Sequence, residues 1–370
     1  METKPTNFNV GKLNIISLIS PISGILYYGQ YGTSGYAQAA KGYLFNYFSR
    51  GIPITWEPLY FDDSKLNNDD VYDIVIKSLI YKDIPEYNVV ILHSTPDLWP
   101  KFWIEKKNKL KNKSVYGYCT WETNILPIKW VESINSTVNE IWCPSQYNKA
   151  AFKDSGVNIP IKVVPHIFLP KKLPDKSTIH LTDSISNAEI PLNDKYTFYS
   201  IGEFNARKGI DDLIHTYCKT FNQQDNVRLI IKTHYKTYSN ENKEYCKNLI
   251  TDILKQYTNY PEIICILDNM SSDEILALHS LGDCYISLTK SEGFGLTIFD
   301  AFNYNNEIIC TGYGGHLDFL GFDYNGLVKY KMGKVEGMES FSNIYTDESE
   351  WAIPNLNHAS ELMKKYYSYE

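Results

Sequence analysis

The feature that most constrains the fold is a regular alternation of short apolar runs with longer amphipathic stretches. In the N-terminal half the apolar runs are LNIISLI, GIPITWEPL, YNVVILHS, KSVYGYC, EIWCPS and IKVVPHIF. Apolar residues at helical spacing lie between them, over residues 36–49, 71–81, 128–135 and 146–155. This alternation is typical of a parallel β-sheet covered by crossover helices.

The same alternation returns after a polar stretch, KKLPDKSTIHLTDSISNAEIPLND, which prolines interrupt and which has no sustained period. Strand-like runs there are YTFYSIGEF, VRLIIKTH, EIICILD, CYISLT and EIICTGY, and helical stretches cover residues 210–221, 241–257, 272–281 and 296–302. A chain of 370 residues is long enough for two domains. We therefore predict an α/β fold of two doubly wound domains, over residues 1–175 and 195–350, with a linker over 176–194 and a closing helix over 351–370.

Composition and charge disfavour several classes of partner. A net charge of −7 at pH 7 argues against nucleic acid. The seven cysteines are scattered, without a C-x-x-C pair or a histidine pair at metal spacing, which predicts reduced thiols in a cytoplasmic protein and no metal site. No stretch reaches the ~20 consecutive apolar residues of a membrane span. The basic and aromatic stretch KFWIEKKNKLKNK, residues 101–113, allows peripheral membrane contact, but a solvated amphipathic helix is the simpler interpretation.

One short stretch, SEGFGLTIFDAF, carries a chemical prediction. Glu292 follows the apolar run CYISLT, Gly293 and Gly295 permit a turn, and Asp300 is expected about one turn into the next helix. The amides of Gly295, Leu296 and Thr297 at the helix N-terminus favour an anion such as a diphosphate. Carboxylates accept hydrogen bonds from sugar or ribose hydroxyls. The stretch therefore predicts a loop that binds phosphate with its backbone and sugar with its side chains.

This loop resembles the signature of the retaining GT-B glycosyltransferases of family 4: a glutamate, seven residues and a second glutamate within an EGFG-type turn. Asp300 stands at the second position. The stretch SIGEFNARKGIDDLIHTY resembles the beginning of the family's nucleotide-binding domain. CTWETNILPIKWVESINSTVNEIWCPSQYNKAAF, TGYGGHLDFLG and WAIPNLNHASELM match a bacterial-type subgroup of the family. The resemblance implies the GT-B fold, in which two Rossmann-like domains face each other across a cleft.

The resemblance also implies roles for residues of the C-terminal domain. Glu292 would contact hydroxyls of the donor sugar, Asp300 the ribose, and Lys208 the donor diphosphate. Many members carry an arginine where this chain has Glu203, and Arg207 is our candidate to supply that charge. The remaining donor-binding candidates lie in the EGFG-type turn: Gly293, Phe294, Gly295, Leu296 and Thr297.

In the N-terminal domain the candidates lie after two strands. In the family, the loop YYGQYGTSGYAQAAKGYL approaches the donor phosphates and the acceptor, which makes Gly35 and Tyr36 donor-binding candidates. His93 ends the run NVVILHS, and the family often places a histidine near the donor sugar. A lone histidine at a strand end is otherwise more often structural, so both interpretations stay open. His316 in GYGGH is a weaker candidate than His93.

The resemblance implies a hexosyltransferase of the EC 2.4 class that moves a sugar from a nucleoside diphosphate sugar to a hydroxyl acceptor. That acceptor would be a glycan, a lipid-linked molecule or a small molecule, and the reaction would retain the anomeric configuration and need no metal or cofactor. Another GT-B enzyme, such as a nucleotide-sugar epimerase or a phosphorylase, is an alternative. A glycoside hydrolase that uses Glu292 and Asp300, and a degenerate sugar-nucleotide-binding protein, also stay open. The sequence does not specify the donor base, the sugar, the acceptor or the oligomeric state.

Overall fold

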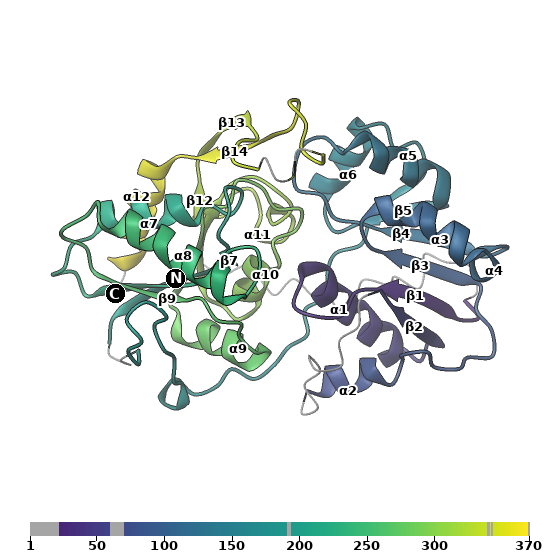
Figure 1. Cartoon of the computed structure of the whole chain (residues 1–370), viewed down its shortest axis with the longest axis horizontal. Helices are drawn as coiled ribbons and strands as arrows, with labels where there is room; N and C mark the ends of the chain where they lie inside the picture. Colours follow the sequence, from purple (N-terminus) through teal and green to yellow (C-terminus); the bar gives the residue numbers. More distant parts are fainter. Residues whose placement is uncertain (1–21, 60–69, 191–193, 339–340, 342, 369–370) are drawn as a thin grey trace. The chain divides into compact units, whose positions relative to one another are not determined.

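The chain divides into two compact units, Met1–Leu169 and Pro170–Glu370. The computed structural model describes residues 22–59, 70–190, 194–338, 341 and 343–368 (Figure 1). The division falls after Leu169, whereas the predicted boundary falls after residue 175. The predicted linker therefore belongs to the C-terminal unit.

The described part of the N-terminal unit is built on a six-stranded parallel sheet in the order β2-β1-β3-β4-β5-β6. Its strands are β1 (Ile25–Gly29), β2 (Ile54–Pro58), β3 (Val89–His93), β4 (Ser114–Tyr118), β5 (Glu140–Cys143) and β6 (Ile161–Val163). Its helices are α1 (Gly35–Ser49), α2 (Val71–Lys77), the 3₁₀ helix η4 (Pro96–Leu98), α3 (Trp99–Glu105), α4 (Lys107–Leu110), α5 (Ile128–Thr137) and α6 (Gln146–Asp154). Helix α1 contacts α2, and α3 contacts α5, so the helices pack in groups along the sheet (Figure 1).

Strand β1 is not the apolar run that we predicted as the first strand. The run LNIISLI lies outside the described residues, and the strand is ILYYG. Ile25 pairs with Ile54 on one side and with Val89 on the other, and the whole strand is buried. Tyr27, Tyr28 and Gly29, which we predicted in the loop, are therefore residues of a central strand.

The C-terminal unit has a second six-stranded parallel sheet within the described residues, in the order β12-β11-β10-β7-β8-β9. Its strands are β7 (Tyr196–Glu203), β8 (Val227–His234), β9 (Glu262–Ile266), β10 (Cys284–Ser287), β11 (Glu307–Thr311) and β12 (Leu327–Val328). Its helices are the 3₁₀ helix η5 (Lys176–Thr178), α7 (Ile210–Thr220), α8 (Asn240–Leu254), α9 (Ser272–Leu281), α10 (Leu296–Asn303), α11 (Leu317–Leu320) and α12 (Leu356–Tyr367). The predicted strands and helices of this half agree with these bounds to within a few residues. Two Rossmann-like α/β domains are therefore confirmed.

Part of the predicted linker is held on the edge strand β9. The amide of Ser184 donates to the carbonyl of Cys265 at 2.7 Å, and the amide of Cys265 donates to Asp183 Oδ1 at 2.8 Å. The amide of Leu267 donates to Ser184 Oγ at 3.0 Å. These bonds satisfy edge groups of the sheet, which explains why the segment belongs to the C-terminal unit.

The predicted closing helix begins later than residue 351. Strand β14 (Glu350–Pro354) pairs antiparallel with β13 (Tyr330–Lys334), and this pairing takes up residues 351–354. Asn355 then caps α12, because its side chain accepts a hydrogen bond from the amide of His358 at 3.1 Å. Helix α12 packs against α7.

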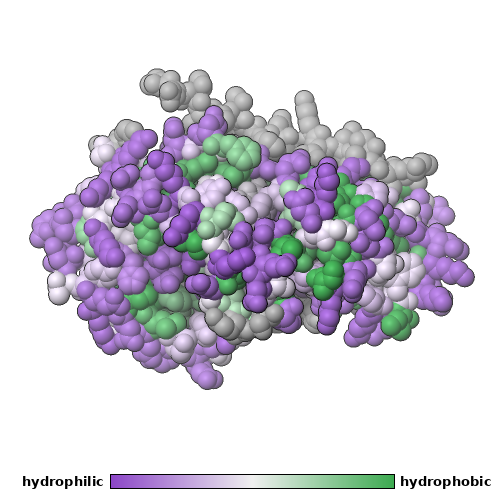
Figure 2. Space-filling view, turned by 90° about the horizontal axis from the view of Figure 1, so that it is seen from above, coloured by the Kyte–Doolittle hydropathy of each residue, from purple (hydrophilic) through white to green (hydrophobic). Residues whose placement is uncertain are grey.

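Hydrophilic residues cover most of the face seen in Figure 2, and hydrophobic residues form separate patches there. No helix within the described ranges is long and apolar enough to cross a membrane. In the basic stretch 101–113, Ile104 is 81% exposed, whereas Phe102 packs on Tyr28 and the Trp103 indole donates to the carbonyl of Thr137 at 2.7 Å. The aromatic side chains of this stretch therefore pack on their own unit.

Candidate active site

In the C-terminal sheet the strand order reverses between β7 and β10. From β7 the chain continues to β8 and β9 on one side, and from β10 it continues to β11 and β12 on the other. Strands β7 and β10 are paired, Phe198 with Cys284 and Tyr199 with Tyr285. Loops that follow two such strands diverge and leave room for a ligand at their carboxyl ends. The two loops that carry the predicted site residues therefore begin next to each other.

The loop after β7 places a basic pair before α7. Asn205 fixes the turn, because its Oδ1 accepts from the amide of Lys208 at 3.0 Å and its Nδ2 donates to Glu203 at 3.0 Å. Gly209 has φ 61°, and a Cβ there would lie 2.4 Å from the carbonyl oxygen of Leu288. Only glycine fits this close approach. The turn therefore holds Arg207 and Lys208 against the loop that follows β10.

Glu292 forms ion pairs with both residues of this basic pair. Lys208 Nζ lies 2.5 Å from Oε1, and Arg207 Nη1 lies 3.4 Å from Oε2. The hydroxyl of Thr289 donates to Oε1 at 3.1 Å. Burial by itself raises the pKa of Glu292, but Lys208 and then Arg207 outweigh it, and the pKa is lowered to about 2. Glu292 is therefore ionised at neutral pH.

The N-terminus of α10 continues the same loop. Gly295 has φ 84° and precedes the first helical residue, Leu296. The first amides of a helix have no carbonyl partner within it, so the amides around Leu296 and Thr297 are suited to an anion. Behind the loop, His316 Nε2 lies 2.7 Å from the carbonyl oxygen of Thr311 and so carries the proton. Burial lowers the pKa of His316, which keeps its imidazole neutral.

The side chains of three predicted donor-binding residues, Phe294, Thr297 and Asp300, differ in burial and in hydrogen bonding. Phe294 is 3% exposed and packs against Phe299 and Phe319, so its side chain is not available to a ligand. The hydroxyl of Thr297 accepts from Tyr285 at 2.7 Å. The carboxylate of Asp300 is partly buried and has no hydrogen bond or ion pair among the described residues. Burial raises its pKa to about 7.

The candidates of the N-terminal unit gather at the reversal point of their own sheet, between β1 and β3. His93 ends β3 and is buried, and its Nδ1 lies 2.5 Å from the hydroxyl of Tyr27. Its Nε2 has no hydrogen-bond partner within the described part of the chain. Gly35 begins α1 and is exposed, and the hydroxyl of Tyr36 donates to the carbonyl of Thr120 at 3.2 Å. The ring of Tyr36 lies 5.5 Å from that of His93.

Sequence reasoning missed several residues of both sites. Thr289 lies in the loop that follows β10, and no sequence motif marks it. Around His93, the rings of Tyr43 and Tyr118 lie at 5.9 and 4.5 Å, and both hydroxyls lie 3.3 Å from His166 Nδ1. In a chain with 30 tyrosines, no spacing signal distinguishes these two. Burial lowers the pKa of His93 well below its usual value, so its imidazole is neutral.

Neither unit holds a metal-ligand cluster within the described ranges. No group of three or more His, Cys, Asp or Glu side chains there could hold a metal ion. Within the described residues the seven cysteines form no disulfide bond, and all are buried.

Comparison with known proteins relates the region around this site to a family. Residues 183–338, which contain both loops, match the family model of the glycosyl transferases group 1. The region that carries both loops is therefore similar to the glycosyl transferases group 1. This agrees with the resemblance to family 4 of the GT-B enzymes, which was drawn from Glu292, Asp300 and the basic pair.

Solved structures share the GT-B fold of this chain. Sucrose-phosphate synthase from Thermosynechococcus elongatus matches with a TM-score of 0.55 and 11% identity, over 93% of this chain and 90% of that one. Anabaena HepE, in complex with UDP-glucose, matches with a TM-score of 0.51 and 14% identity, over 94% of this chain and 95% of that one. The chain spans 51% of the length of S. aureus TarM.

A viral relative is also similar in sequence. Uncharacterized protein 356 of Sulfolobus islandicus rod-shaped virus 1 is 22% identical over 259 residues, which is 67% of this chain and 67% of that protein.

Proposed function

We propose that this chain moves a sugar from a nucleoside diphosphate sugar to a hydroxyl acceptor, with retention of the anomeric configuration and without a metal ion. The observation that carries the proposal is the pairing of Arg207 and Lys208 with Glu292 beside the N-terminus of α10. Two cations and one carboxylate leave a net positive charge next to unpaired helix amides. That arrangement suits a diphosphate leaving group, whose charge grows as the glycosidic bond breaks.

Lys208 and Arg207 would bind the diphosphate on one side, and the amides at the N-terminus of α10 would bind it on the other. Glu292 stays ionised, so one of its oxygens can accept from a donor-sugar hydroxyl when Lys208 turns toward the phosphate. Asp300 would accept from the ribose hydroxyls, because its carboxylate has no other partner among the described residues. The bound UDP-glucose of HepE, on the same fold, supports a nucleotide sugar as the donor.

The reaction needs no protein nucleophile in this proposal. The leaving diphosphate deprotonates the acceptor hydroxyl on the same face of the sugar, and that oxygen forms the new bond to the anomeric carbon. Lys208 stabilises the charge that develops on the diphosphate. His93, whose imidazole is neutral, is the residue that the family resemblance implies near the donor sugar. Exclusion of water protects the donor from hydrolysis.

The test is a turnover assay with UDP-, GDP- and ADP-sugars and a panel of hydroxyl acceptors, read by mass spectrometry. We expect the sugars of one of the three nucleotides only to give product. EDTA should leave the rate unchanged, and Lys208→Ala should lower kcat by about 10²-fold or more. NMR of the product anomer tests retention. Conversion of donor without an acceptor would indicate an epimerase, and a requirement for inorganic phosphate a phosphorylase. Binding without turnover for every acceptor would favour a degenerate binding protein.

A further inference from the structure

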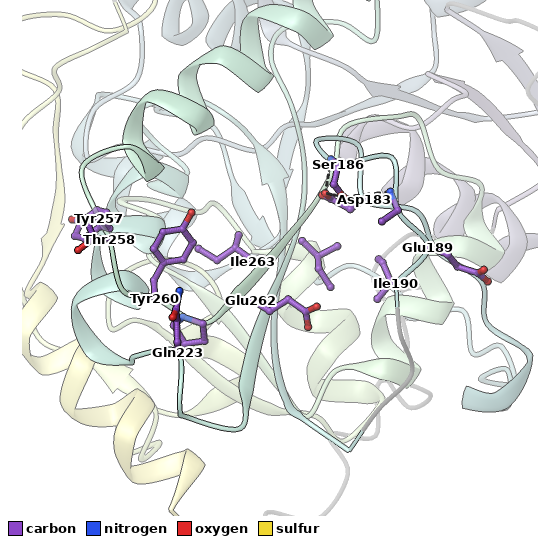
Figure 3. A pocket seen from close by; sticks show the side chains of 13 residues that line it. Asp183, Ser186, Glu189, Ile190, Gln223, Tyr257, Thr258, Tyr260, Glu262 and Ile263 are labelled. Carbon is purple, nitrogen blue, oxygen red and sulfur yellow. Dashed lines mark hydrogen bonds between the residues drawn. The ribbon is translucent and has the colours of Figure 1, made fainter.

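A second cavity lies in the C-terminal unit, away from the donor loops. Its volume is about 530 Å³, and it is formed by residues 183–190, Gln223 and residues 257–264 (Figure 3). These include the first residues of β9, so the cavity lies toward the amino end of the edge strand. The donor loops follow the carboxyl ends of β7 and β10, and three strand spacings, about 14 Å, separate β10 from β9. One nucleotide sugar in the donor loops would not also fill this cavity.

The charge of the cavity is opposite to that of the donor loops. Its lining contains the carboxylates of Asp183, Glu189 and Glu262 and, among the described residues, no lysine or arginine. A phosphate in this cavity would meet the carboxylates of Asp183 and Glu189 at short range, and the two cations beside the lining, Lys195 and Arg228, are already paired with Glu262. Nucleotides and sugar phosphates are therefore disfavoured, and a neutral ligand is favoured.

Individual side chains leave polar atoms available to such a ligand. Lys195 and Arg228 both approach Glu262 at Oε2, at 3.2 and 3.8 Å, and among the described residues no hydrogen bond reaches Oε1, which can accept one from a ligand. Gln223 is exposed and presents an amide with both donor and acceptor groups. Figure 3 shows Tyr260 and Gln223 on one side of Glu262 and Ile263.

The backbone of β9 adds a donor and an acceptor. The amide and carbonyl of Cys265 face the outer edge, where Asp183 and Ser184 bind them. Backbone groups alternate in direction along a strand, so those of Ile263 face the same edge, two residues earlier, beside the cavity. Within the described residues, no hydrogen bond of the segment that covers Cys265 reaches the amide or carbonyl of Ile263.

We infer that this cavity binds a neutral saccharide. A pyranose presents an apolar C–H face, which suits the half-buried ring of Tyr260, and hydroxyls, which suit Glu262, Gln223 and the Ile263 backbone. The cavity volume falls in the range of small-molecule sites. The next step rests on the proposed function: the saccharide is the part of the acceptor that lies away from the reacting hydroxyl.

Saturation-transfer NMR tests this inference on the full chain. The probes are methyl α-glucoside, methyl α-mannoside, methyl α-galactoside, N-acetylglucosamine and maltotriose, each with UDP present to occupy the donor loops. We expect saturation transfer to at least one probe, and an affinity about tenfold lower in Tyr260→Ala and in Gln223→Ala. Gln223 is exposed, so its variant keeps the test valid if Tyr260→Ala is unstable. Tyr245→Ala, at a 48% exposed tyrosine of α8 outside the cavity, is the matched control and should bind normally.

Two results would overturn the inference. One is the absence of saturation transfer to every probe. The other is a signal that survives Tyr260→Ala and Gln223→Ala but is lost in Asp300→Ala, because the sugar would then lie in the donor loops. Failure of the proposed function is distinguishable, since a chain that binds no nucleotide would still show a signal sensitive to Tyr260 and Gln223.

Discussion

Replacement of Lys208 by methionine tests the energetics of the ion pair at the centre of the site. Glu292 is 8% exposed, and its pKa is lowered from an ordinary 4.5 to about 2. At about 1.4 kcal/mol for each pKa unit, this difference corresponds to about 3 kcal/mol of folding stability. Lys208 is the largest of the causes that lower the pKa, and Arg207 remains in the variant, so we expect a loss of about 2 kcal/mol.

The sign of the pH dependence follows from the direction of the shift. Because the pKa of Glu292 is lowered in the folded chain, its ionised carboxylate stabilises the fold at pH values above the ordinary pKa of 4.5. This stabilisation is lost as the pH falls through about 2. The full effect is therefore present at pH 7. For a unit of the size of Pro170–Glu370, 2 kcal/mol corresponds to a decrease in Tm of roughly 4–8 °C.

Differential scanning calorimetry at pH 7 measures this effect in a double-mutant cycle with Glu292→Gln. We expect the double variant to melt no lower than Lys208→Met, because Glu292→Gln removes a buried carboxylate that Lys208→Met leaves with Arg207 alone to offset its burial. Additive Tm decreases, or a Lys208→Met variant that melts within about 1 °C of the wild type, would refute the reasoning.

Three further predictions concern single residues. The affinity for a nucleoside diphosphate sugar should rise about tenfold from pH 6 to pH 8, because ribose hydroxyls favour ionised Asp300, whose pKa is about 7. Calorimetric titration should show this rise in the wild type and a flat profile in Asp300→Asn, and a flat wild-type profile would contradict the ribose role. Gly209→Ala should lower the free energy of unfolding by at least about 2 kcal/mol, because its Cβ would lie 2.4 Å from the Leu288 carbonyl oxygen. Gly51→Ala is the control, because Gly51 also has a positive φ of 71° but no atom lies within 4 Å of the new Cβ. Urea denaturation should show a smaller decrease in the free energy of unfolding for Gly51→Ala than for Gly209→Ala. Equal decreases would remove the steric explanation. Phe294→Ala should lower the free energy of unfolding by about 3–4 kcal/mol and leave nucleotide affinity unchanged, because its side chain packs in the core. Weaker nucleotide binding without a loss of stability would place that ring in the donor site instead.

The sequence alone predicted much of the C-terminal unit, because its signals are local. The run VRLIIKTH is continuous, β-branched and apolar, and it coincides with β8 (Val227–His234). Glu292 and Lys208 follow strands of one parallel sheet, so their convergence at one edge follows from the fold class.

Contacts between distant segments were not predictable in the same way. The pairing of β13 with β14 depends on the partner strand, and an amphipathic pattern alone favoured helix from residue 351. The polar stretch around Asp183 and Ser184 has no periodicity, and only the open edge of β9 gives it a place to bind. The EGFG-type turn predicts a ligand loop, but it does not show that the ring of Phe294 turns into the core.

The most direct test of the donor site is a calorimetric titration of UDP, GDP and ADP into the wild type, Lys208→Ala and Asp300→Ala. Our account predicts that one base binds, and that each variant weakens that binding by about tenfold or more, because we propose that Lys208 holds the diphosphate and Asp300 the ribose. Heat from none of the three nucleotides at millimolar concentration would contradict the account.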